Sequence, residues 1–169
     1  QFLAVARDRG AILIIDIQPG QSPWMDEVKH FRKYLEMPDV SLALDPEWKV
    51  DKGEVPGQTR IGTIKPAEIN EVTAYMQQII DEKKLPQKLL IVHEFKDYQL
   101  RNQDAIVNRR GVATVLNVDG FGPADQKVAT YTTLTDPARG RAFPMGFKLF
   151  YDEDTRNGGT LMNPGDVLN

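Results

Sequence analysis

Acidic residues stand at the carboxyl ends of several short apolar runs in this chain. Asp16 follows one run, Asp119 follows another, and Glu47 stands just after a third. Two carboxyl groups about 5–10 Å apart can cleave a glycosidic bond, because one donates a proton while the other acts as nucleophile or base. We therefore predict Asp16, Glu47 and Asp119 as catalytic residues, with Glu47 as the proton donor and Asp16 or Asp119 as its partner.

Aromatic residues stand near the ends of the same runs. They are Trp48, Phe121 and Tyr151. Aromatic side chains present large apolar faces, which suits packing against the apolar face of a sugar ring. Packing in the core or at the rim of the protein would explain these three positions equally well.

Four further polar residues stand at or near the carboxyl ends of these apolar runs. Asp45 ends the second run and could bind substrate or cap an ordinary turn. His93 ends the third run and could orient a carboxylate, donate to a sugar hydroxyl group, or be a satisfied core residue. Lys148 and Asp152, at the last run, could bind substrate or form a structural ion pair. The predicted substrate-binding residues are therefore Asp45, Trp48, His93, Phe121, Lys148, Tyr151 and Asp152.

The sequence predicts neither a cofactor nor a transition-metal site. It has no cysteine and two histidines, of which only His93 stands near the acids, whereas such sites need thiolate or imidazole ligands. It also lacks a glycine-rich phosphate loop and a Gly-x-Ser-x-Gly motif. Asp16, Asp45, Glu47 and Asp119 are hard oxygen ligands that could hold Mg²⁺ or Ca²⁺. A metal-dependent phosphoester hydrolase is therefore one alternative.

The elements that would position these residues alternate between strands and helices. Short apolar runs predict strands, and apolar residues that recur every three or four positions predict helices. The stretch from Val112 to Val118, between glycines, reads as a strand covered on both faces. The predicted strands are 11–15, 40–44, 88–92, 112–118 and 145–151; the predicted helices are 1–9, 24–35, 66 to about 85, 98–109, 123–133 and one that begins at 163.

This alternation is typical of an α/β domain with a parallel sheet. The 169 residues form one domain, which we interpret as the C-terminal five βα units of a (β/α)₈ barrel that lacks its N-terminal units, because both ends fall inside an element. A five-stranded doubly wound open sheet is the alternative. The long irregular stretch from Asp45 to about Lys65 is predicted to cover the site.

Composition and charge argue against some classes of partner and location. Apolar residues make up 41% and charged residues 27% of the chain, as in soluble globular proteins. The net charge of −3 is not concentrated in blocks, which disfavours nucleic acid as a partner. The longest apolar run, Ala11–Ile15, is far shorter than the roughly 20 residues that span a bilayer, so no membrane span is expected.

Several segments resemble a group of secreted or lipid-anchored actinobacterial proteins of TIM-barrel, glycoside-hydrolase-like type. They are Leu44-Asp45-Pro46-Glu47-Trp48, Val55-Pro56-Gly57, Leu85-Pro86-Gln87-Lys88-Leu89, Val92-His93-Glu94-Phe95, Val118-Asp119-Gly120-Phe121-Gly122 and Gly146-Phe147-Lys148-Leu149-Phe150-Tyr151-Asp152-Glu153-Asp154. The resemblance implies a barrel, an extracellular or cell-envelope location and a carbohydrate partner. It implies no established reaction, so a non-catalytic carbohydrate-binding or structural protein is a further alternative. In that group the position of Glu94 is often glutamine, which disfavours a catalytic role for Glu94.

If the last strand is the eighth of a barrel, the three predicted catalytic acids follow its fourth, fifth and seventh strands. That placement is similar to the Asp, Glu, Asp arrangement of amylase-like glycosidases, although the motifs around those acids are absent here. The members of the resembling group are longer at the N-terminus. We therefore expect that the missing N-terminal part of the same barrel would complete the sheet.

Overall fold

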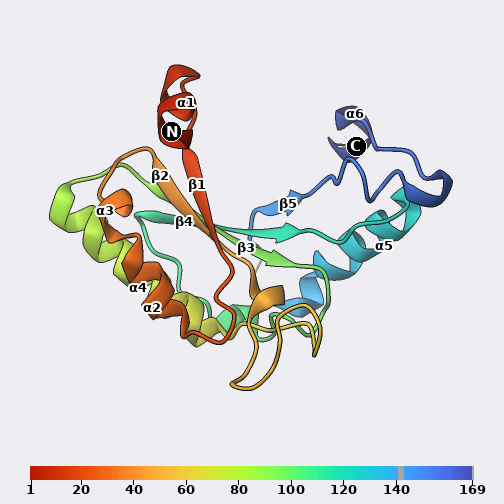
Figure 1. The fold of residues 1–169 in the computed structure, drawn as a ribbon, viewed down its shortest axis with the longest axis horizontal. Helices are drawn as coiled ribbons and strands as arrows, with labels where there is room; N and C mark the ends of the chain where they lie inside the picture. Colours follow the sequence, from red (N-terminus) through yellow and green to blue (C-terminus); the bar gives the residue numbers. More distant parts are fainter. Residues whose placement is uncertain (141–142, 169) are drawn as a thin grey trace.

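Five parallel strands form one sheet in the computed structural model, which describes residues 1–140 and 143–168. Each strand pairs in parallel with the next strand of the chain, so the order in space equals the order in sequence. The strands are β1 (Leu13–Ile17), β2 (Val40–Leu44), β3 (Lys88–Glu94), β4 (Val112–Val118) and β5 (Met145–Phe147). The prediction of an α/β fold with five parallel strands is confirmed, and the sheet is not closed (Figure 1).

The strand order bears on which parallel architecture this is. A doubly wound sheet reverses its order at a switch point, whereas the strands of a barrel wall follow one another without reversal. The order β1-β2-β3-β4-β5 contains no reversal, so it does not support the doubly wound alternative. Closure of a complete barrel by further strands stays a prediction.

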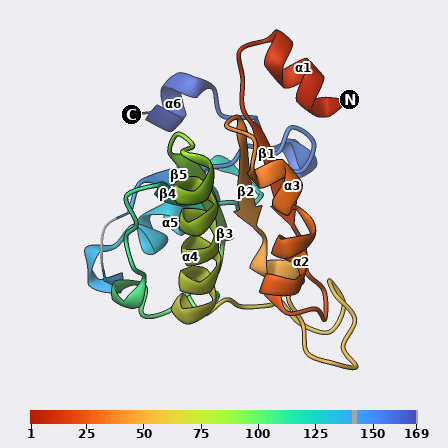
Figure 2. The ribbon, with the colours of Figure 1, turned by 90° about the vertical axis from the view of Figure 1, so that its left-hand side faces the viewer.

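Helices connect the strands, and the three largest connecting helices lie on the same side of the sheet (Figures 1 and 2). Right-handed crossovers between parallel strands that advance in one direction place their helices on one face. The helices are α1 (Phe2–Asp8), α2 (Trp24–His30), α3 (Arg32–Leu35), α4 (Pro66–Lys83), α5 (Ala124–Leu134) and α6 (Pro164–Leu168), with 3₁₀ turns η1 (Pro46–Trp48), η2 (Gln103–Ala105), η3 (Pro137–Arg139) and η4 (Arg156–Gly158).

The core lies between this outer face of the sheet and the helices. Alternate strand residues point outward, and Leu44, Val92 and Leu116 are fully buried against Ile69 and Met76 of α4. The residues between them point to the inner face. Along β4 these inner residues are only partly buried, so the prediction that this strand is covered on both faces is wrong for its inner face.

Strand β1 begins two residues later than predicted. Its pairing with β2 starts at Leu13 opposite Val40, and Asp16 pairs with Ala43. The apolar residues Ala11 and Ile12 are exposed instead, because the chain leaves α1 there and has not yet reached β2. Asp16 therefore lies inside the strand and not beyond its end.

The helix predicted over residues 98–109 is wrong. Only the 3₁₀ turn η2 forms there, because side chains take the place of helical hydrogen bonds. The Gln99 amide oxygen accepts from the backbone N–H groups of Phe95 and Lys96, and the Asn70 side chain accepts from the N–H of Val107.

Two further elements also differ from the prediction in where they end. The helix predicted over 24–35 breaks at Phe31 into α2 and α3. Strand β5 ends at Phe147 and does not reach Tyr151, because Asp154 accepts a hydrogen bond from the N–H of Phe150 and so turns the chain away from the sheet. Among the described residues, none of the helices combines the length and apolar character that crossing a bilayer requires.

Candidate active site

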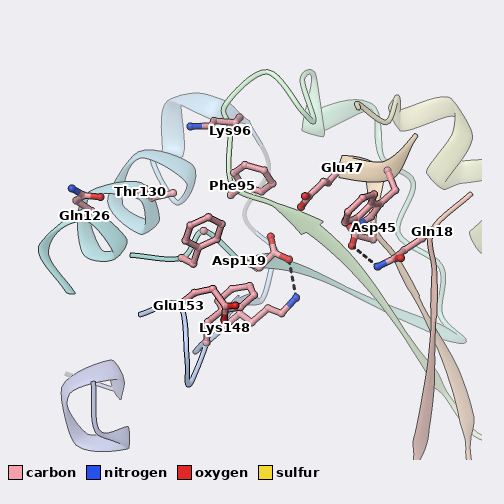
Figure 3. Close-up of a pocket in the computed structure, with 14 residues that line it drawn as sticks. Gln18, Asp45, Glu47, Phe95, Lys96, Asp119, Gln126, Thr130, Lys148 and Glu153 are labelled. Carbon is pink, nitrogen blue, oxygen red and sulfur yellow. Dashed lines mark hydrogen bonds and ion pairs between the residues drawn. The ribbon is translucent and has the colours of Figure 1, made fainter. Parts of the chain in front are cut away.

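A cleft of about 590 Å³ opens at the carboxyl ends of the strands. In parallel α/β folds this is the edge where ligands bind, because every strand delivers its following loop to it. Figure 3 shows that acidic side chains occupy one part of the cleft and that α5 borders another. The cleft is lined by Gln18, Asp45, Glu47, Trp48, Phe95, Lys96, Asp119, Gly120, Phe121, Gln126, Thr130, Lys148, Phe150 and Glu153.

Asp45 and Glu47 enter the cleft from the end of β2. The backbone N–H of Asp45 still donates to the carbonyl of Ile17 on β1, and the chain then turns through η1, which begins at Pro46. Burial raises the pKa of Glu47, and the negative charges of Asp45 and Asp119 raise it further. Glu47 therefore keeps its proton to a higher pH than an exposed glutamate.

Asp45 is more deeply buried than Glu47. Its Oδ2 accepts a hydrogen bond of 3.2 Å from the side chain of Gln18. Burial raises the pKa of Asp45; His93 lowers it in part, whereas Asp119 and Asp16 raise it. Its Oδ1 is buried and has no hydrogen-bond partner among the described residues. Because an unpaired buried oxygen costs free energy, Asp45 is not placed for stability alone.

Asp119 comes directly after β4 and has a different environment. Its Oδ2 lies 3.1 Å from Nζ of Lys148 and 3.1 Å from Nδ1 of His93. The Asp119 side chain is 5% exposed. In Figure 3 the carboxyl groups of Asp119 and Glu47 point toward the same space in the cleft. The two carboxyl groups thus differ in their direct contacts: Asp119 pairs with Lys148 and His93, whereas these two cations act on Glu47 only by their charge and lower its pKa less than burial and the two acids raise it.

His93 lies on the inner face of the sheet, behind Asp119. Its Nδ1 also lies 3.1 Å from the amide nitrogen of Asn117, and its Nε2 lies 3.8 Å from Oδ2 of Asp16. Burial lowers the pKa of His93, but the hydrogen bond and charge of Asp119, with the charge of Asp16, outweigh burial and raise it overall. A protonated ring then donates from Nδ1 to Asp119, since a carboxylate can only accept, and its Nδ1 can no longer accept a hydrogen bond from the Asn117 amide.

Buried Lys127 on α5 joins the two loops that carry Asp119 and Lys148. Its Nζ donates to the carbonyls of Gly120 and Lys148 at 2.7 and 2.8 Å, and it pairs with Asp154 at 3.0 Å. Burial opposes ionisation of Asp154, but the N–H groups of Phe150 and Gly122 and the ammonium group of Lys127 together lower its pKa. This ion pair fixes the backbone on either side of the cleft.

Aromatic rings line the part of the cleft beside α5. Phe121 is 67% exposed, and its ring meets that of Phe150 edge-on at 6.0 Å between centroids. Phe95 comes from the loop after β3, and the polar side chains of Gln126 and Thr130 come from α5. The cleft thus joins a charged region to an aromatic one.

Six of the predicted site residues line the cleft and four do not, although one of these four, His93, contacts Asp119. Asp45, Glu47, Trp48, Asp119, Phe121 and Lys148 all line the cleft. Asp16 lies on the inner face of the sheet beside His93, which contacts Asp119 from behind. Tyr151 and Asp152 lie beyond the cleft lining and are exposed to solvent, Tyr151 at 77%.

Sequence reasoning missed several residues of the cleft. Gln18 stands two residues after Asp16 at a strand end, a signal that could have identified it. Lys96, Gln126 and Thr130 lie in a loop and on a helix, where spacing carries no such signal. Lys127 was also missed, because a lysine in an amphipathic helix is normally exposed.

Glu94 faces the helices and not the cleft. It is fully buried, and its Oε2 lies 2.8 Å from the guanidinium group of Arg139. Burial raises its pKa to about 7, although Arg139 acts in the opposite direction. This position at the outer face agrees with a structural role for Glu94.

Within residues 1–140 and 143–168, no three His, Asp or Glu side chains are grouped so that they could hold a metal ion. The alternative of a Mg²⁺- or Ca²⁺-dependent phosphoester hydrolase therefore gains no support from the geometry.

In comparisons with known proteins, no family model matches the chain, and no curated protein or solved structure matches it significantly.

Proposed function

We propose that the cleft hydrolyses a glycosidic bond of an envelope or extracellular carbohydrate, with Glu47 as proton donor and Asp119 as nucleophile or base. One observation carries this proposal: Glu47 and Asp119 both line one cleft, and their direct contacts differ. Burial and neighbouring acids raise the pKa of Glu47, whereas Lys148 and His93 balance the charge of Asp119. A carboxyl group whose pKa is raised by burial suits the proton donor of a reaction, and a carboxylate held by ion pairs suits the nucleophile or base.

The other cleft residues fit the same chemistry. The exposed ring of Phe121 offers a flat apolar surface, and Gln18, Gln126 and Thr130 offer amide and hydroxyl groups to sugar hydroxyls. A mixture of aromatic surface and a few polar groups is typical of small-molecule sites. Asp16 is no longer the preferred partner of Glu47, because it lies beside His93 on the inner face.

Hydrolysis of a panel of 4-nitrophenyl glycosides and of bacterial envelope glycans tests this proposal. Loss of the proton donor in Glu47→Gln or of its partner in Asp119→Asn should lower kcat by about 10²–10⁴-fold. Exposed Glu71 on α4 supplies the matched control, and Glu71→Gln should retain full activity. Unchanged turnover in Glu47→Gln, with circular dichroism showing a folded protein, would refute the assignment.

A non-catalytic carbohydrate-binding function is a second candidate. It is favoured by the exposed ring of Phe121 beside Gln126 and Thr130, since an aromatic surface with a few polar groups can bind a ligand without cleaving it. Calorimetric titration of the same glycans would then show equal binding in the native protein and in Glu47→Gln, with no product released by either.

A further inference from the structure

Glu47 lines two cavities at once. Besides the cleft, Glu47 borders a smaller cavity of about 190 Å³, whose other walls are Gly57, Gln58, Arg60 and Ile61. We call this the loop cavity, because residues 57–61 belong to the long loop between η1 and α4. Glu47 thus stands at the boundary between the cleft and the loop cavity.

The wall of the loop cavity is fixed to the turn that carries Glu47. The N–H of Gly62 donates to the carbonyl of Glu47 at 2.9 Å, and Gly57 packs so closely on Trp48 that a Cβ atom there would lie 2.7 Å from the indole ring. At the other end of the loop, the Gln21 side chain donates to the carbonyl of Glu54 at 2.8 Å. The cavity therefore has a preformed wall.

Ion pairs inside the loop determine whether the loop cavity suits a neutral or a charged ligand. Arg60 lies 2.6 Å from Asp51 and 2.8 Å from Glu54, so two carboxylates balance its charge. The remaining polar residues of the cavity wall are Gln58, which is exposed, and Glu47. An amide donates and accepts hydrogen bonds, which suits the hydroxyl groups of a neutral sugar. An anionic group would meet Glu47 without an unpaired cation to hold it.

We propose that the loop cavity binds the leaving group of the glycosidic substrate, that this leaving group is a neutral sugar unit, and that the cleft holds the sugar that is attacked. The inference rests on the proposed function, because a proton donor must lie beside the oxygen that leaves. The bond between the anomeric carbon and this oxygen breaks, and Glu47 protonates the oxygen. Water supplies the hydroxyl group that the anomeric carbon gains and the proton that Glu47 regains.

Substrates with different leaving groups on the same sugar test this inference. The probes are the fluorides, the 1-phosphates and the reducing disaccharides of glucose, galactose, mannose, xylose and N-acetylglucosamine. A fluoride leaving group is too small to contact the loop cavity. Gln58→Ala should therefore lower kcat/KM about tenfold for the disaccharide, as for the loss of one hydrogen bond to a bound group, and leave the fluoride unchanged.

Gln78→Ala is the matched control, because Gln78 is exposed on α4 and should affect neither substrate. Equal effects of Gln58→Ala on fluoride and disaccharide would overturn the inference while leaving the proposed function intact. Faster cleavage of the sugar 1-phosphate than of the disaccharide would overturn the neutral class of leaving group. If the native protein cleaves no probe, the proposed function falls and the inference falls with it.

Discussion

The pKa of His93 reports the electrostatics of the site and can be measured without a substrate. Asp16, Asp45 and Asp119 are the acids that face this ring from β1, β2 and β4, and Lys148 is the nearby cation. Asp119 raises the pKa of His93 by a hydrogen bond and by its charge. The folded protein therefore binds this proton more tightly than the unfolded chain does.

The pH dependence of folding follows from this difference. The raised pKa of His93 contributes stability that is fully present below the unfolded value of about 6.5 and is lost as the pH rises through the folded value. In Asp119→Asn the pKa of His93 should fall, and this loss of stability with rising pH should disappear. Titration of the ring by NMR gives the first quantity, and urea unfolding at several pH values gives the second. A His93 pKa that is the same in both proteins would contradict the ion pair.

At the scale of elements, Lys127 ties helix α5 to the loops after β4 and β5. Its side chain is 3% exposed and that of its partner Asp154 is 2% exposed. Lys127→Met should lower the free energy of unfolding by about 3–5 kcal/mol, because Asp154 is left buried without its cation. Lys83→Met removes an exposed pair with Glu36 and should cost less than about 1 kcal/mol. Equal losses in urea unfolding would show that Lys127 does not hold these loops.

Gly62 fixes the long loop to the turn η1 in a comparable way. A Cβ atom at Gly62 would clash with the backbone carbonyls of Pro46 and Lys49, so Gly62→Ala must displace the turn that carries Glu47. We expect a loss of about 1–3 kcal/mol in unfolding free energy and a changed fluorescence of Trp48. Gly120→Ala is the control, since its Cβ would meet only side-chain atoms of Phe95 and Thr130, at 3.4 and 3.7 Å. A Gly62→Ala protein as stable as this control would refute the close packing.

The success of sequence reasoning also differed between elements. Apolar runs predicted β2 and β4 because all five residues of β2 are buried and the burial of β4 alternates regularly. Spacing likewise predicted α4, whose buried residues recur on one face. It failed over residues 98–109, because the Gln99 side chain bonds to the backbone before the helix could begin. Side-chain hydrogen bonds to distant or irregular backbone leave no periodic signal.

Acidic residues at predicted strand ends could be assigned to one edge of the sheet, and three of the five so assigned, Asp45, Glu47 and Asp119, line the cleft. The side chains that neighbour each acid could not be predicted from the sequence. The pairing of Asp119 with His93 depends on the register of β3 and β4, in which His93 lies opposite Asn117. A shift of two residues was enough to move Asp16 from the predicted strand end into β1.

For the whole molecule, the sheet has one covered face and one partly open face. Helices α2 and α4 pack on the outer face (Figure 2). Leu90 points to that face and is 0% exposed, whereas Ile91, the next residue, points to the inner face and is partly exposed. Leu90→Ala should therefore cost about 2–5 kcal/mol of unfolding free energy.

Ile91→Ala removes a similar side chain from the opposite face of the same strand, so the two variants form a matched pair. Because Ile91 keeps contact with water in the folded protein, less apolar surface is removed from water there, and we expect a loss below about 2 kcal/mol. Urea unfolding of both variants at one pH measures the difference. Equal losses would mean that the inner face is as fully covered in solution as the outer face, and would contradict an open sheet.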